Sequence, residues 1–251
     1  MEQTTSCLKV IGLLGLLAVL IPLSATAETS GQSPSASLAF ARYVASIQEP
    51  DPFADSGPLA VAFEASLPSL YKQMRVLTIR GISASERSEY ILVGAEGDVI
   101  AAQEVIGQYL KIQAQMEDMP FSSLAVTPAN YRFRYKGEVG AGTSQAYVYQ
   151  ITPKRKRAGL MEGQLWIDSA TGAAILQTGR LVKPPSPFLG GVGVVRDIKL
   201  VNGSPCARVT HITFETPRAG RAELTITEIP LAQGDDLGTE PAPLVRKVGP
   251  E

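Results

Sequence analysis

The sequence has very little histidine and cysteine. His211 is the only histidine, and the two cysteines are Cys7 and Cys206. A single histidine excludes histidine-rich metal sites, and it allows a Ser-His or Cys-His nucleophile only if His211 itself is the base. His211 lies in an alternating stretch typical of a strand, which favours a structural role. No nucleophile-elbow motif or phosphate-binding glycine-rich loop occurs either. We therefore expect a non-enzymatic protein with no cofactor and no metal.

Neither sign of charge is in large excess, because 23 basic and 24 acidic residues leave a formal net charge of −1. This balance predicts no bulk attraction to nucleic acid. Long apolar runs are lacking too, since the longest, residues 10–23, is shorter than the roughly 20 residues of a spanning helix. An uncleaved anchor is the alternative for that run, but a cleavable signal is favoured, with no stable membrane anchor afterwards.

What the first 27 residues do contain is the pattern of a secretory signal peptide. Lys9 precedes the apolar stretch, and Ala25-Thr26-Ala27 forms a small-residue cleavage site. We therefore expect residues 1–27 to be removed and the rest to reside in the periplasm. Removal of Cys7 leaves Cys206 as the only cysteine, so no internal disulfide can form and the fold depends on its own core.

The remaining chain indicates one domain over residues 37–230, between a flexible lead-in (28–36) and a loose tail (231–251). Helices are predicted over 37–47 and 98–116; Asp98 caps the second, and Val99, Ile106 and Leu110 mark one of its faces. Period-two patterns and turn residues predict strands over 59–67, 70–80, 89–94, 131–135, 147–151, 160–168, 174–183, 192–201, 206–216 and 221–229.

The last seven of these strands, joined by short turns, indicate an antiparallel meander. Asn202-Gly203 is a strong hairpin signal, and Asp168 and Gly172 suit a tight turn. A sheet with one apolar face must be covered, and the two helices are the candidates. The expected fold class is α+β: a curved antiparallel sheet, or incomplete β-barrel, with helices covering the concave face.

Two sets of apolar residues are candidate ligand contacts. The first is an aromatic face that could line a pocket for acyl chains: Phe133, Tyr135, Tyr147 and Tyr149, with Trp166 near in sequence. The same face is also typical of a core beneath a covering helix. The second is Phe188, in the proline- and glycine-rich segment 183–191, which is either a loop gating a cavity or a linker between strands.

The basic turn Lys154, Arg155, Lys156 and Arg157 is a candidate contact for anionic head groups or for a protein partner. Each positive charge near an anionic surface contributes about 1 kcal/mol. A solvated hairpin tip is the alternative for this turn.

The carboxy-terminal half resembles a known family. The runs 147–154, 159–172 and 179–183 hold a Leu-Trp-Ile-Asp segment followed by Thr-Gly and then another strand. This progression resembles outer-membrane lipoprotein-sorting (LolA/LolB-like) proteins, within a group of uncharacterised exported bacterial proteins. The resemblance covers about residues 131–229 and implies an incomplete barrel whose cavity shelters acyl chains.

Two functions follow as hypotheses. The first is a periplasmic carrier-like protein that binds a lipid or an acylated lipoprotein without catalysing a reaction. The second is an envelope interaction or sensory module with a filled core and no ligand, whose partners are envelope proteins. A fold shared by carriers and sensors does not choose between them.

Overall fold

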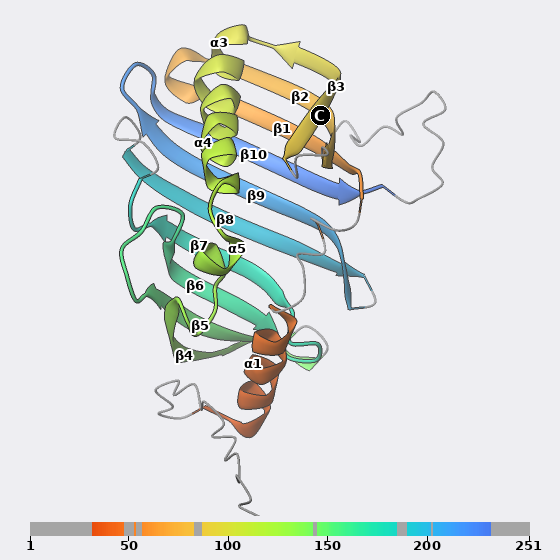
Figure 1. The fold of residues 1–251 in the computed structure, drawn as a ribbon, viewed down its shortest axis with the longest axis vertical. Coiled ribbons are helices and arrows are strands. Elements are labelled where there is room, and N and C mark those ends of the chain that lie inside the picture. The colour runs from red at the N-terminus through yellow and green to blue at the C-terminus, as the bar shows by residue number, and fades with distance from the viewer. Residues whose placement is uncertain are drawn as a thin grey trace, which may run out of the picture.

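The computed structural model describes residues 32–47, 53, 57–82, 87–142, 145–184, 190–201 and 203–231. The expected signal peptide, most of the lead-in, Phe188 and nearly all of the tail lie outside these ranges. Within the ranges, a ten-stranded sheet and a few helices make up the fold (Figure 1).

The sheet is antiparallel and open, with the strand order β3-β2-β1-β10-β9-β8-β7-β6-β5-β4. Its ends, β3 and β4, do not pair with each other, which confirms the expectation of an incomplete barrel. The strands are β1 (Leu59–Leu67), β2 (Lys72–Ile82), β3 (Ser88–Gly97), β4 (Tyr131–Val139), β5 (Ala146–Pro153), β6 (Met161–Asp168), β7 (Ala174–Leu181), β8 (Gly190–Val201), β9 (Ser204–Thr216) and β10 (Gly220–Pro230).

The seven-stranded meander is confirmed from β4 to β10. In β10, Ala222, Leu224 and Ile226 are buried and alternate with half-buried polar residues, as the period-two pattern predicts. The first three strands extend this sheet, because β1 pairs with β10 in the register Leu59↔Pro230 to Ser66↔Glu223. Between β1 and β2, Pro68 begins a short 3-10 turn, η1 (Pro68–Leu70), so β2 starts two residues later than predicted.

Helix α1 (Pro34–Ser46) begins three residues earlier than predicted, inside the expected lead-in. The reason is local: the Ser33 side chain accepts a hydrogen bond from the Ala36 backbone, and Pro34 is at the first helical position, where its missing N–H costs nothing. Phe40 and Tyr43 are buried on the predicted face of the helix, and they pack against β4 and β5.

The second predicted helix is a continuous helical run of three parts: α3 (Val99–Ala101), the π-helical turn η2 (Ala102–Ile106) and α4 (Gly107–Glu117). Asp98 caps it as predicted, because its carboxylate accepts a hydrogen bond from the Ile100 backbone at 2.8 Å. The prediction that Val99 faces the core was wrong: Val99 is 63% exposed, and Ala101 and Val105 are buried instead. The π turn adds one residue to a turn of the helix. Residues before and after it therefore no longer share the face that regular helical spacing predicts.

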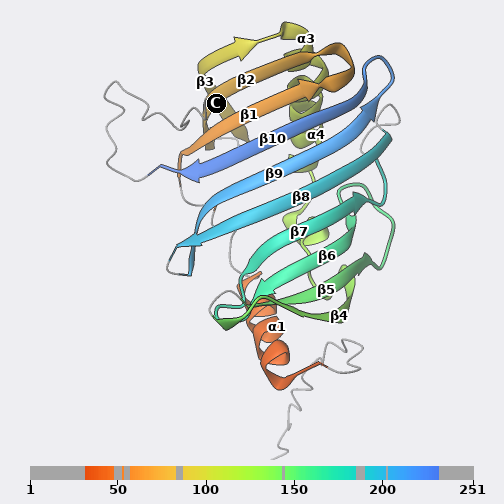
Figure 2. The same ribbon diagram turned by 180° about the vertical axis from the view of Figure 1, so that it is seen from behind.

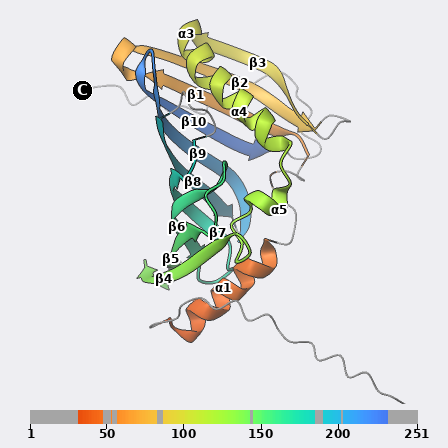
Figure 3. The ribbon, with the colours of Figure 1, turned by 60° about the vertical axis from the view of Figure 1, so that its left-hand side comes forward.

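The helices lie on the concave side of the sheet, with α4 across one half and α1 against the other (Figures 1 and 3). A short helix, α5 (Phe121–Leu124), follows α4. The opposite face carries no helix in the part of the chain that the structure describes (Figure 2). The predicted α+β class, with helices on the concave face, is confirmed. None of the described helices is long and apolar enough to cross a membrane.

The core has two parts. One cluster joins β1, β9 and β10 to α3 and η2, and the other joins β4, β5 and β6 to α1. Leu181 and Val194 pack against both clusters, near the middle of the sheet. Where β6 and β7 pair, Gly163 lies opposite Gly179. A Cβ atom on Gly163 would lie 1.9 Å from the Thr178 carbonyl oxygen, so the close approach of the two strands requires glycine.

Candidate functional site

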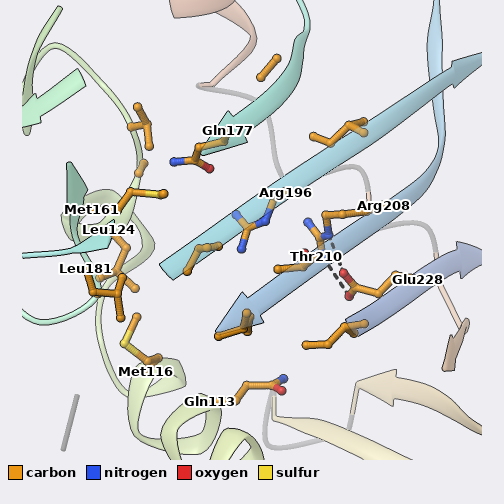
Figure 4. Close-up of a pocket in the computed structure, with 18 of the residues that line it drawn as sticks. Gln113, Met116, Leu124, Met161, Gln177, Leu181, Arg196, Arg208, Thr210 and Glu228 are labelled. Carbon is orange, nitrogen blue, oxygen red and sulfur yellow. Dashed lines mark hydrogen bonds and ion pairs between the residues drawn. The ribbon is translucent and has the colours of Figure 1, made fainter. Parts of the chain in front are cut away.

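A cavity of about 590 Å³ lies on the concave face, where the two core clusters meet. Strands β7 to β10 form its floor, and residues of α4, α5 and the end of α1 form its roof (Figure 4). Neither helix fills this space, because α1 packs on β4 to β6 while the buried part of the other helical run packs on β1 and β10.

The floor follows from strand alternation. Even-numbered residues of β8, β9 and β10 point into the cavity, because side chains two apart share one face of a strand. Its apolar members are Val192, Val194, Ile198, Ile212, Phe214, Leu224 and Ile226. Apolar side chains therefore make up most of the floor across three neighbouring strands.

The roof and the side wall are also largely apolar. They include Ile112 and Met116 of α4, Leu124 of α5, and Met161 and Leu181 from the strands. In Figure 4, Met116, Leu124, Met161 and Leu181 lie together at one end of the cavity. We name these four residues the apolar end.

The other end of the cavity holds a group of charged residues: Arg80, Arg196, Arg208 and Glu228. The Glu228 carboxylate is buried and accepts hydrogen bonds from Arg208 Nε at 2.5 Å, Arg208 Nη2 at 3.0 Å and Arg80 Nη1 at 2.9 Å. Arg80 also donates to the Phe53 carbonyl oxygen at 3.0 Å, and the Arg208 guanidinium lies 4.5 Å from the centre of the Phe53 ring. We name Arg80, Arg196, Arg208 and Glu228 the polar end.

Neutral polar groups from α4 add to this end. Tyr109 and Gln113 line the cavity, and Gln113 accepts a hydrogen bond from the Tyr90 hydroxyl at 2.9 Å. Burial raises the pKa of the Tyr109 phenol above its ordinary value, and the positive charges of Arg196 and Arg208 offset only part of that rise. The Tyr109 hydroxyl therefore keeps its proton at neutral pH.

The predicted aromatic residues come together, but beneath α1. Phe133, Tyr147 and Tyr149 are buried and Tyr135 is half-buried. The Phe40 ring of α1 lies 5.0 Å from both the Phe133 and the Tyr149 rings, and the Tyr149 hydroxyl donates to the Ala36 carbonyl at 3.0 Å. The arrangement is that of a core beneath a covering helix.

Neither this aromatic group nor Trp166 contributes to the cavity. None of the five predicted ligand contacts that the structure describes is among its lining residues, and Phe188 lies outside the described ranges. Trp166 alternates along β6 with the buried Leu165 and Ile167, so its side chain is on the opposite face of the sheet.

The predicted basic turn is anchored at both ends. Lys154, Arg155 and Lys156 are exposed, and Lys154 Nζ donates to the Pro128 carbonyl at 2.5 Å. Arg157 is half-buried and donates to the Ser123 carbonyl and to the Asn130 side chain, both at 3.2 Å. These bonds hold the turn in place while three of its charges face solvent.

His211 is exposed at an odd-numbered position of β9, on the face opposite the cavity, and its Nδ1 lies 2.9 Å from Thr225 Oγ1. Among the described residues, no three His, Cys, Asp or Glu side chains gather as a metal site would require. Cys206 is free and half-buried.

Sequence reasoning missed the polar end of the cavity. Arg196 and Arg208 occupy inward positions of strands whose other inward residues include Val192, Val194 and Ile212. In a strand whose residues alternate between apolar and polar, an arginine at one of the apolar positions is unusual. This signal could have identified both residues. Glu228 is the corresponding acidic exception at the end of β10.

No family model matches the chain, and no curated protein matches it. Among solved structures, a LolA superfamily protein from Nitrosomonas europaea aligns over 83% of this chain and 99% of its own, with 12% identity and a TM-score of 0.31. MucB aligns over 79% of this chain and 94% of its own, with 13% identity and a TM-score of 0.25. MucB in complex with MucA(peri) aligns over 76% and 92%, with 10% identity and a TM-score of 0.23. At these TM-scores the likenesses carry no argument, and the fold class rests on the strand order and register described above.

Proposed function

We propose that this protein binds a small molecule of the lipid class, without catalysing a reaction, in the cavity between β7–β10 and α4. The cavity itself is the observation that carries the proposal: at about 590 Å³ it lies within the roughly 300–1,000 Å³ of small-molecule sites, and its lining is mostly aliphatic. Each methylene group removed from water into such a lining contributes about 0.8 kcal/mol to binding.

The compartment and the physiological ligand belong to the same proposal. The signal pattern in residues 1–27 supports a periplasmic location. The lipoprotein-sorting resemblance of residues 131–229 supports a free lipid or the acyl chain of a lipoprotein as the ligand. The ligand-binding surface is the cavity, in place of the aromatic face that the sequence indicated, because α1 covers that face.

A matched pair of variants tests the cavity. Val194 and Val195 are adjacent in β8, but Val194 lines the cavity whereas Val195 is 38% exposed on the other face. We expect Val194→Trp to weaken uptake of an apolar fluorescent probe about tenfold or more, since an indole placed in the cavity excludes the ligand. Val195→Trp should bind as the unmodified protein does. If both variants bound the probe equally well, the ligand site would lie outside the cavity.

Mass spectrometry of organic extracts tests whether the protein carries a ligand from the cell. The protein, exported and purified without detergent, should yield a lipid or acylated molecule in stoichiometric amount, and the Val194→Trp variant should yield much less. A folded protein that carries no such molecule and takes up no apolar probe would contradict the proposal.

Contact with an envelope protein is a second candidate function, and the exposure of Lys154, Arg155 and Lys156 on an anchored turn favours it. We expect that replacing these three residues with glutamine reduces capture of an acidic partner from envelope extracts while leaving probe uptake unchanged. Unchanged capture would remove this turn from consideration. The corresponding control replaces three exposed basic residues of β4, Arg132, Arg134 and Lys136.

A further inference from the structure

The charge of the cavity is confined to its polar end. Three arginines and one glutamate are the only ionisable residues of formal charge among the described lining residues, so the formal charges sum to 3 − 1 = +2. They come from four strands: Arg80 from β2, Arg196 from β8, Arg208 from β9 and Glu228 from β10. A largely apolar cavity thus has its charged lining residues on one side.

Strand register fixes where these side chains lie. Arg208 is paired with Glu228 across β9 and β10, and Arg196 is paired with Thr210 on one side and with Gln177 on the other. Figure 4 shows Arg196, Arg208, Thr210 and Glu228 on neighbouring strands, apart from the methionines and leucines of the apolar end. Gln177, Arg196 and Thr210 therefore form a row of hydrogen-bond donors next to the ion pairs of Glu228.

Glu228 is the one acidic residue among the described residues that line the cavity. Its two oxygens are shared by Arg80 and Arg208, whose side chains are 12% and 13% exposed, so the three residues together keep a net charge of +1. Removal of a charged group from water carries a large desolvation cost, which a partner of opposite charge reduces. Guanidinium groups recognise carboxylates and phosphates with two parallel hydrogen bonds, which a lysine does not provide.

The apolar end sets the second requirement on the ligand. Met116, Leu124, Met161 and Leu181 present no hydrogen-bonding group other than thioether sulfur, so this end excludes a second charge. A molecule that satisfies both ends carries its charge on one side only. That is the chemistry of an amphiphile with one anionic head group.

We propose that Arg196, with Arg80 and Arg208 beside it, binds the anionic head group, a carboxylate or a phosphate, of an amphiphile whose hydrocarbon chain occupies the apolar end. This inference rests on the proposed function and specifies its ligand class. Tyr109, Gln113 and Thr210 supply neutral hydrogen-bond donors around the head group.

Four probes test the proposal: dodecanoate, dodecyl phosphate, dodecanol and inorganic phosphate, each titrated into the full mature protein by calorimetry. At least one anionic amphiphile should bind about tenfold or more tightly than dodecanol, because only it reaches the guanidinium groups. Arg196→Gln should reduce that ratio to about twofold. Arg155→Gln, which changes an exposed arginine of the basic turn, should leave the ratio unaltered.

The outcomes separate the two proposals. Equal affinity for dodecanol and both anionic amphiphiles overturns the head-group site and leaves the lipid-binding function standing. Failure of all three amphiphiles to bind overturns the function itself. Inorganic phosphate that binds as tightly as dodecyl phosphate identifies a site for a free anion and overturns the amphiphile. Since the comparison of probes on the unmodified protein decides these outcomes, the proposal stays falsifiable if Arg196→Gln does not fold.

Discussion

Replacing Glu228 with glutamine should destabilise the protein by about 3 kcal/mol, measured as the free energy of unfolding in urea. The substitution keeps the size of the side chain and removes its charge. Arg80 and Arg208, both nearly buried, then lose the carboxylate that lies within 3.0 Å of each of them. Removal of one partner from a buried ion pair is costly because the charge left behind remains out of water.

Glu223→Gln is the matched control on the same strand. Glu223 pairs with Arg221 at 2.8 Å, but their side chains are 44% and 61% exposed. Exposed pairs of this kind contribute about 0–1 kcal/mol, so the control should change the free energy of unfolding by less than 1 kcal/mol or so. Equal losses in the two variants would show that the Glu228 ion pairs are not a structural element of the cavity.

The second large effect is expected at the pair Gly163 and Gly179, between β6 and β7. Gly163→Val should destabilise the protein by about 3 kcal/mol or more, because its Cβ atom would lie 1.9 Å from the Thr178 carbonyl oxygen and 2.5 Å from the Gly179 Cα atom. Both of these atoms belong to the backbone, so the strands themselves must separate. The measurement is again urea unfolding.

Gly94→Val separates this steric effect from the loss of a strand glycine. Gly94 lies in β3, is exposed, and has no atom within 4 Å of the position of a Cβ. Valine favours strands, so the change in the free energy of unfolding should stay within about 0.5 kcal/mol. A Gly163→Val variant as stable as Gly94→Val would mean that β6 and β7 are free to move apart.

Local patterns determined most of the fold. Alternation in β4 and β10 predicted both strands, and the turn between β6 and β7 was predicted from Asp168, whose carboxylate accepts hydrogen bonds from the Ala170 and Thr171 backbones. The pairing of β1 with β10 is different, because Leu59 and Pro230 are far apart in sequence and no local signal connects them. The π turn η2 was also missed, since residue propensities do not mark where a helix accepts an extra residue.

The candidate site was much harder to predict. The aromatic residues of β4 and β5 have the same pattern whether they line a pocket or pack under a helix. In the structure, Phe40 and Tyr43 of α1 pack against Phe133. The cavity arises where two helices cover different halves of one sheet, a property of their placement that no single segment encodes. Only the charged residues at inward strand positions, Arg196, Arg208 and Glu228, gave a signal in the sequence.

The helix over the cavity is held mainly from one end. Its first half buries Ala101, Val105 and Ile106, whereas none of the eleven residues of α4, all of them described, is fully buried. Ile112 and Met116 face the sheet across the cavity. A hydrocarbon chain in that space would act as the layer of core between α4 and β8–β10. Ligand binding and the ordering of α4 would then be coupled through one free energy. A change that destabilises the packing of α4 would therefore weaken ligand binding by the same free energy.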